Sequence, residues 1–190
     1  MKKSIGACPA LFPMPVQMIA TYNDDGSVDL MNAAWGGILD SDLLVLSLDS
    51  THRTSDNIKK RKAFTLSIAD ETTIKESDYV GMVSENLFPG KFLKTGLSAS
   101  KSEKVDAPIV NEYKLTLECE VEKISDDEMG FFVYARIKDV LVDESILDPK
   151  GKVDVTKLKP IMFDQFKNGY YSLGEKAGQA WDAGKPFLKK

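Results

Sequence analysis

Two neighbouring segments in the second half of the chain constrain its fold most strongly. Apolar side chains from Leu115 to Val121 alternate with polar ones that include Thr116 and Glu118. A second alternation runs over 131–138, after a short polar turn. A period of two is typical of a strand with one buried and one solvated face. The pattern therefore predicts an antiparallel pair of strands with Thr116 and Glu118 on its solvated face.

Most of the other elements are also predicted to be short strands. Runs rich in apolar residues, bounded by turn residues, predict strands at 15–22, 27–34, 43–48 and 63–69. Helices are expected at 55–62 and 72–83, a long loop at 86–102, and an irregular segment after Asp143. Many strands with few helices favour a closed or nearly closed antiparallel barrel, because closure removes exposed edges. We expect residues 1–190 to form one domain of mainly β structure with a few peripheral helices.

Charge and hydropathy narrow the range of partners. The net charge of −4 and the pI near 5.2 argue against nucleic acid or an anionic membrane surface as the main partner. Prolines at 9, 13 and 15 interrupt the stretch after the charged start, and no apolar run approaches the ~18 residues of a membrane helix. We therefore expect a cytoplasmic protein.

Several common chemistries lack their sequence signatures. His52 is the only histidine, which excludes a multi-histidine metal site within one chain. The sequence has no GxSxG elbow, no GxxxxGK loop and no GxGxxG fingerprint. Its two cysteines, Cys8 and Cys119, form no CxxC motif. These absences argue against the usual hydrolase, nucleotide-loop and Rossmann sites.

Several motifs in their order along the chain resemble one known family. They are Leu-Phe-Pro-Met-Pro-Val at 11–16, Met-Asn-Ala-Ala-Trp-Gly-Gly at 31–37, Ser-Leu-Asp-Ser-Thr-His-Arg-Thr at 47–54 and Tyr-Tyr-Ser-Leu-Gly-Glu at 170–175. This order resembles the flavin reductase-like family, whose fold is the FMN-binding split barrel, and within it the flavoredoxin branch. The resemblance implies an antiparallel split β-barrel that binds FMN.

The resemblance places the FMN phosphate at the turn formed by Ser50, Thr51, His52, Arg53 and Thr54. Hydroxyls, a cation and the start of a predicted helix suit a dianion, because a helix N-terminus presents free N–H groups and a positive dipole. The family pattern assigns the main contacts to Thr51 and Thr54, with His52 or Arg53 adding charge. The alternative is that Thr54 only caps the helix.

The resemblance also implies contacts to the isoalloxazine ring. Asn32, Ala33, Ala34 and Trp35 match the segment that lies along the ring, where small residues allow the backbone to approach closely. Trp35 either stacks near the flavin or fills the core. The glycines at 36–37 are expected to permit the tight turn that follows.

Two further positions are candidate flavin contacts. Ser67 stands where many relatives have Asn, so it keeps a hydroxyl but loses the amide. Lys94 lies in a loop that resembles a family loop near the flavin, and Lys91 is the alternative to it. A lysine near the carbonyl edge of the ring would favour the reduced, anionic flavin.

The resemblance implies an FMN-binding redox protein that transfers electrons through its bound flavin, as an electron carrier or a flavin-dependent oxidoreductase. One alternative is an NAD(P)H-dependent flavin reductase that uses flavin as a substrate. Another, of a different class, is a non-catalytic module that binds flavin or another cofactor. The redox partner is either a protein or NAD(P)H, and we expect a homodimer because aromatic residues near the C-terminus need a surface to pack on.

Overall fold

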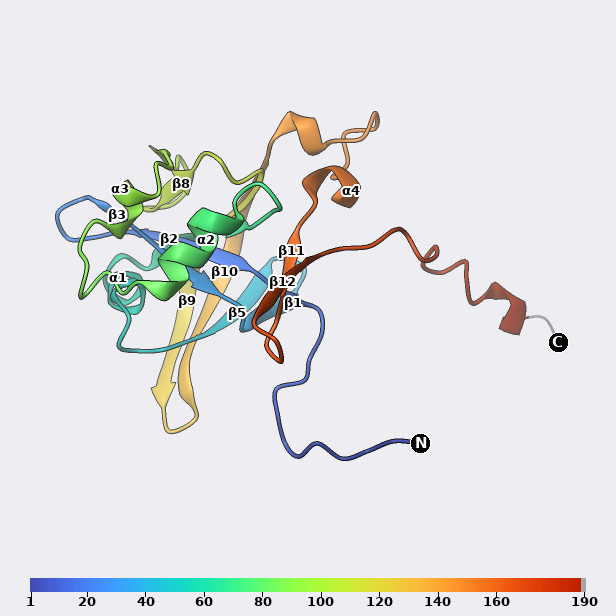
Figure 1. Ribbon diagram of the computed structural model, residues 1–190. Helices are drawn as coiled ribbons and strands as arrows, with labels where there is room; N and C mark the ends of the chain where they lie inside the picture. The colour runs from blue at the N-terminus through green and yellow to red at the C-terminus, as the bar shows by residue number, and fades with distance from the viewer. Residues whose placement is uncertain (189–190) are drawn as a thin grey trace.

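A seven-stranded antiparallel sheet forms the body of the protein in a computed structural model that describes residues 1–188 (Figure 1). Its strand order is β3-β2-β6-β9-β10-β5-β4. The strands are β2 (Gln17–Tyr22), β3 (Val28–Ala33), β4 (Gly36–Asp40), β5 (Leu43–Leu48), β6 (Ala63–Ile68), β9 (Leu115–Asp127) and β10 (Gly130–Val142). The prediction of a mainly β, antiparallel fold is confirmed.

The long hairpin of β9 and β10 follows the predicted alternation on one face only. Cys119, Phe131 and Val133 are buried in the main core, as expected. Thr116 and Glu118, which we predicted to be solvated, are each only 2% exposed. The Thr116 hydroxyl is 2.8 Å from that of Ser67, and Glu118 accepts a hydrogen bond from Ser102. The prediction failed because this face of the hairpin is also covered by other parts of the chain.

Two smaller sheets complete the β structure. One has the order β1-β11-β12 and the other pairs β7 with β8. Their strands are β1 (Met14–Pro15), β7 (Ala99–Lys101), β8 (Pro108–Val110), β11 (Ile161–Asp164) and β12 (Gly169–Ser172). The segment after Asp143 is therefore less irregular than predicted, since β1 near the N-terminus provides a pairing edge for β11. It also contains α4 (Val155–Leu158) and the 3₁₀ turns η1 (Glu144–Ile146) and η2 (Lys185–Leu188).

Three helices lie beside the strands that form the candidate site. They are α1 (Arg53–Arg61), α2 (Ile74–Met82) and α3 (Lys91–Lys94). The first two were predicted within about two residues at each end, whereas α3 and β7 lie in a segment predicted to be a loop. Thr54 does not cap α1, because the helix begins at Arg53, two residues earlier than predicted, with His52 at the N-cap position.

A second cluster of buried side chains connects α2 and α3 to the sheet. Val80 on α2 and Phe92 on α3 pack with Met18 and Leu30 of the β2–β3 hairpin. This packing fixes both helices against β3, the edge strand from which the candidate site is built. Within residues 1–188, no helix combines the length and apolar character needed to cross a membrane.

Candidate functional site

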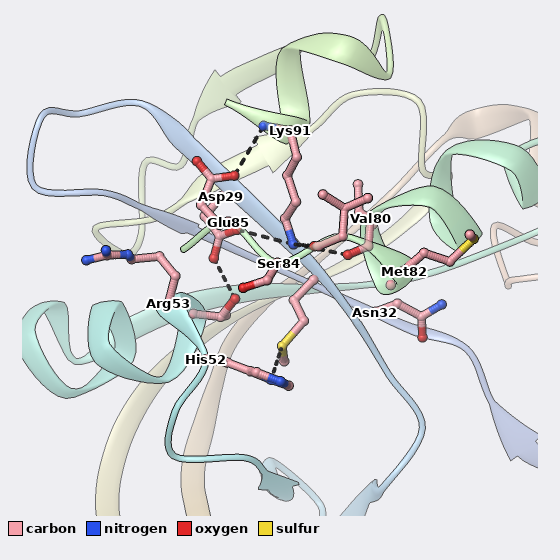
Figure 2. A pocket seen from close by; sticks show the side chains of 13 residues that line it. Asp29, Asn32, His52, Arg53, Val80, Met82, Ser84, Glu85 and Lys91 are labelled. Atoms are coloured by element: carbon pink, nitrogen blue, oxygen red, sulfur yellow. Dashed lines mark hydrogen bonds and ion pairs between the residues drawn. The ribbon is translucent and has the colours of Figure 1, made fainter. Parts of the chain in front are cut away.

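A cavity of about 260 Å³ lies between β3, the start of α1 and the segment from α2 to α3 (Figure 2). The sheet contributes one wall, the helix start a second, and the end of α2 with its following loop a third. The lining side chains are those of Asp29, Met31, Asn32, His52, Arg53, Thr54, Val80, Gly81, Met82, Val83, Ser84, Glu85 and Lys91.

The start of α1 gives this cavity an anion-binding character. Residues 53–55 form the first turn, where backbone N–H groups have no carbonyl one turn earlier to bind. These N–H groups and the helix dipole favour a negative charge. The preceding turn is held in place because Thr51 donates from its backbone N and its Oγ1 to Asp49, at 2.8 and 2.7 Å.

A buried polar cluster forms the inner wall of the cavity. Asp29 is fully buried on β3, and its Oδ2 accepts a hydrogen bond of 2.5 Å from Thr54 Oγ1. The Lys91 ammonium lies 3.7 Å from Asp29 Oδ1 and is itself only 3% exposed. Burial raises the pKa of Asp29, although Thr54 and Lys91 oppose this, and burial lowers the pKa of Lys91.

Lys91 also organises the third wall. Its Nζ donates to the carbonyl oxygens of Val80 and Val83, each at 3.0 Å, and so satisfies acceptors at the end of α2. Glu85 accepts hydrogen bonds from the backbone N–H groups of Gly90 and Lys91, at 2.7 and 3.2 Å. Together these bonds fix the loop between α2 and α3.

A second hollow of about 180 Å³ continues from the first, because Met31, Asn32 and His52 line both. The small side chains of Ala33 and Ala34 and the indole of Trp35, which is 58% exposed, line it as well. The two hollows together offer a charged end and a flatter, more apolar end.

Asn32 joins the sheet to α2 where the two hollows meet. Its Nδ2 donates to the carbonyl oxygen of Ser77, at 3.1 Å. Gly81 lies against it so closely that an added Cβ would be 3.1 Å from the Asn32 Cβ. Behind this contact, the Tyr170 hydroxyl donates to Asp78, at 2.8 Å, and thereby connects the C-terminal motif to α2.

Comparison with known proteins identifies the family. Residues 10–168 match the family described as the flavin reductase like domain. The chain belongs to the flavin reductase-like family. The predicted fold class is confirmed, because the solved structures that it resembles include flavin reductase-like split barrels.

Two flavoredoxin structures resemble this flavin reductase-like chain over nearly its whole length. Flavoredoxin of Desulfovibrio vulgaris (Miyazaki F) is 34% identical, with a TM-score of 0.91 over 97% of this chain and 100% of that one. Flavoredoxin of Methanosarcina acetivorans is 25% identical, with a TM-score of 0.87 over 98% and 100% of the two chains. An uncharacterised protein of Aquifex aeolicus is 23% identical over 78% of this chain and 79% of its own length. These findings support a flavin-related redox function.

The structure brings most of the sequence-predicted site residues of this family member together. Those that line the two hollows are Asn32, Ala33, Ala34, Trp35, His52, Arg53 and Thr54. Ser50 and Thr51 lie in the turn that leads into α1 but do not line either hollow. Whether any of them contacts a flavin stays a prediction.

Two predicted residues lie elsewhere. Ser67 is 2% exposed and hydrogen-bonded to Thr116 inside the sheet, away from both hollows. Lys94 is exposed and lines a separate surface hollow with Lys75 and Tyr79. The buried Lys91, named from the sequence only as an alternative to Lys94, is the lysine that faces the cavity.

Sequence reasoning missed Asp29 entirely. A signal was present, because an acidic residue stands inside the apolar run from Val28 to Met31. A charged residue buried in a strand needs a partner, and this need is typical of a functional or networked position. Its partners, Thr54 and Lys91, are distant in the sequence, so no local motif connects them.

Proposed function

We propose that this chain binds FMN in the two joined hollows and transfers electrons through it, as a flavoredoxin does. The observation that carries the proposal is the joining of an anion-binding end at α1 to a flat end lined by Ala33, Ala34 and Trp35. FMN has the matching shape, with a dianionic phosphate at one end and a flat ring system at the other. When bound, the flavin supplies the redox chemistry, and the protein supplies binding, orientation and electrostatics.

The phosphate end is assigned to the first turn of α1 and to Lys91. The backbone N–H groups of residues 53–55 provide donors, and the Lys91 ammonium provides a charge that water does not screen well. The Thr54 hydroxyl is already donated to Asp29, so Thr54 contributes through its backbone. His52 is exposed and lines the cavity, where its imidazole can hydrogen-bond to the phosphate.

The ring end is assigned to the second hollow. Ala33 and Ala34 have no bulk that would keep a ring from the backbone, and the exposed indole of Trp35 offers a surface for stacking. Trp35 does not fill the core, since more than half of its surface is exposed. Flavin contacts by Ser67 and Lys94 are not favoured by their positions.

An absorption spectrum of the purified protein, with the released chromophore identified by mass, tests the cofactor. We expect oxidised FMN in near-stoichiometric amount. A colourless protein that also fails to bind added FMN would contradict the proposal and leave the non-catalytic module as the better interpretation. Fast NAD(P)H oxidation that depends on free flavin would instead favour the flavin reductase.

Lys91→Gln tests the phosphate assignment, and Lys94→Gln on the same short helix is the matched control. Removing the buried ammonium should weaken FMN binding at least tenfold and riboflavin binding much less, because only FMN carries the phosphate. Lys94→Gln should leave both affinities within about twofold. Equal losses for the two flavins in Lys91→Gln would refute the assignment.

We also propose that the domain, taken as residues 1–190, acts as a homodimer through the surface around β4. Trp35, Ile38 and Leu39 are 58%, 64% and 53% exposed, and two apolar hollows of about 310 Å³ each lie beside them. Large exposed apolar patches mark interaction sites. Ile38→Lys should shift sedimentation toward the monomer, whereas Met129→Lys, at a hairpin tip where Met129 is 86% exposed, should not. A monomeric wild-type protein at micromolar concentration would contradict this proposal.

A further inference from the structure

Asp29 is an unusual residue to find in the wall of an anion-binding cavity. Its side chain is fully buried, and it lines the cavity between Thr54 and Lys91. Oδ2 accepts from Thr54, but Oδ1 has no hydrogen-bond partner among the residues that the structure describes. The nearest cation is the Lys91 ammonium, 3.7 Å from Oδ1. Oδ1 of this buried carboxylate is thus paired with one cation, at a distance longer than a hydrogen bond.

The charged groups around Asp29 come from three elements. Lys91 faces it from α3, Glu85 from the loop between α2 and α3, and Arg53 and His52 line the same cavity at the start of α1. Glu85 is already held by two backbone N–H groups. Asp29 is held instead by the Thr54 hydroxyl and the Lys91 ammonium, and burial raises its pKa in spite of both.

The hydrogen bonds of Lys91 determine how many donors remain for an incoming anion. An ammonium has three donors, and two of them are given to the carbonyl oxygens of Val80 and Val83. Only one donor is left for Asp29 or for an incoming phosphate. A dianion that took this donor would deprive the buried Asp29 carboxylate of its ion pair with Lys91 and bring a like charge close to it, which is unfavourable.

On the basis of the proposed function, we propose that Asp29 is a specificity-determining residue, which lowers the affinity of the cavity for phosphate-bearing FMN relative to phosphate-free riboflavin. The carboxylate competes with the phosphate for Lys91 and repels its charge. Riboflavin brings no charge to this end of the site and therefore meets no such penalty.

The test compares the dissociation constants of FMN and riboflavin for the full-length flavin-free protein and for Asp29→Asn, by fluorescence quenching at pH 8. Asparagine keeps the shape of aspartate and can still accept from Thr54. We expect FMN to bind Asp29→Asn at least tenfold more tightly, or about 1.4 kcal/mol, with riboflavin unchanged within about twofold. Asp25→Asn, which removes an exposed carboxylate from the turn of the same hairpin, should change neither value.

Each outcome separates this inference from the proposed function. Flavin binding that is unchanged in Asp29→Asn, or that rises equally for FMN and riboflavin, would overturn the role of Asp29 and leave the proposed function intact. A wild-type protein that binds neither flavin would overturn both. Circular dichroism confirms that the variant folds, and Asp29→Ser, whose hydroxyl can still pair with Thr54, replaces it if it does not.

Discussion

Gly36 opens β4 at a place where no other residue fits without displacing its neighbours. A Cβ added there would lie 2.6 Å from Leu46 Cδ2, 2.7 Å from Gln17 Oε1 and 3.0 Å from the carbonyl oxygen of Val45. The backbone of Gly36 is extended strand and not left-handed. We expected the glycines at 36–37 to permit the tight turn that follows; both lie in β4, and the absence of a side chain at Gly36 matters because of close packing.

The neighbours of Gly36 determine the cost of Gly36→Ala. The Gln17 side chain can move, but Leu46 is fully buried and the Val45 carbonyl belongs to the adjacent strand, so neither yields freely. Overpacking of this kind costs about 1–3 kcal/mol. In a chain of this size each kcal/mol corresponds to about 2–4 °C in Tm. We therefore expect Gly36→Ala to lower Tm by about 2–12 °C.

Gly37→Ala is the matched control, because an added Cβ at Gly37 would meet no atom within 4 Å. It should leave Tm unchanged or raise it slightly, since alanine restricts the unfolded chain. Thermal unfolding followed by circular dichroism at one protein concentration measures both variants, which keeps any contribution of assembly constant. A Gly36→Ala protein as stable as the wild type, or a Gly37→Ala protein that loses as much, would refute the packing argument.

Three further predictions concern hydroxyl and thiol groups. Tyr170→Phe removes the hydrogen bond to Asp78 and should lower the free energy of unfolding by about 1 kcal/mol in urea titrations. An unchanged free energy of unfolding would mean that water replaces this hydrogen bond equally well. Cys8 is exposed, whereas Cys119 is buried and burial raises its pKa to about 12. An aromatic disulfide reagent at pH 8 should therefore titrate one thiol in the native protein and two in denaturant. Burial likewise raises the pKa values of Tyr113 and Tyr170 to about 12. With Cys119, these groups ionise first in the unfolded state, so the free energy of unfolding should fall as the pH rises from about 9 to 12; a flat profile would contradict this.

Local sequence patterns predicted those parts of the fold that depend on local chemistry. The strand at 43–48 agrees with β5 at both ends, because a short apolar run bounded by polar residues leaves little choice. The burial of Thr116 and Glu118 was missed because it depends on Ser67, which pairs with Thr116 across β6 and β9, and on Ser102, and both are distant from β9 in the sequence. Alternation of apolar and polar residues predicts one buried face of a strand. It does not predict burial of the opposite face when that face is lined by hydrogen-bonded polar groups.

The candidate site also has a part that was predicted from the sequence and a part that was not. The residues at 32–35 and 52–54 were predicted because each set is continuous in the sequence, and the structure brings the two sets to adjoining hollows. The cluster of Asp29, Thr54 and Lys91 was not predicted, because its members come from β3, α1 and α3 and meet only in the folded chain. The site that we infer thus combines a part readable from motifs and a part set by packing.

The connection from β3 to β4 explains why the two hollows lie where they do. These strands stand at opposite ends of the seven-strand order, yet only Ala34 and Trp35 separate them in the sequence. Seven strands laid flat would place the outer strands about 29 Å apart, whereas three residue steps span at most about 11 Å. The sheet must therefore curl until β3 and β4 approach each other at this connection, and the Trp35 carbonyl extends the β4–β5 pairing by accepting from Ser47 N, at 2.8 Å. Ala34 and Trp35 line the second hollow because they connect the two outer strands, and Gly36 must lack a side chain because Leu46 of β5 and Gln17 of β2 would lie 2.6 and 2.7 Å from its Cβ.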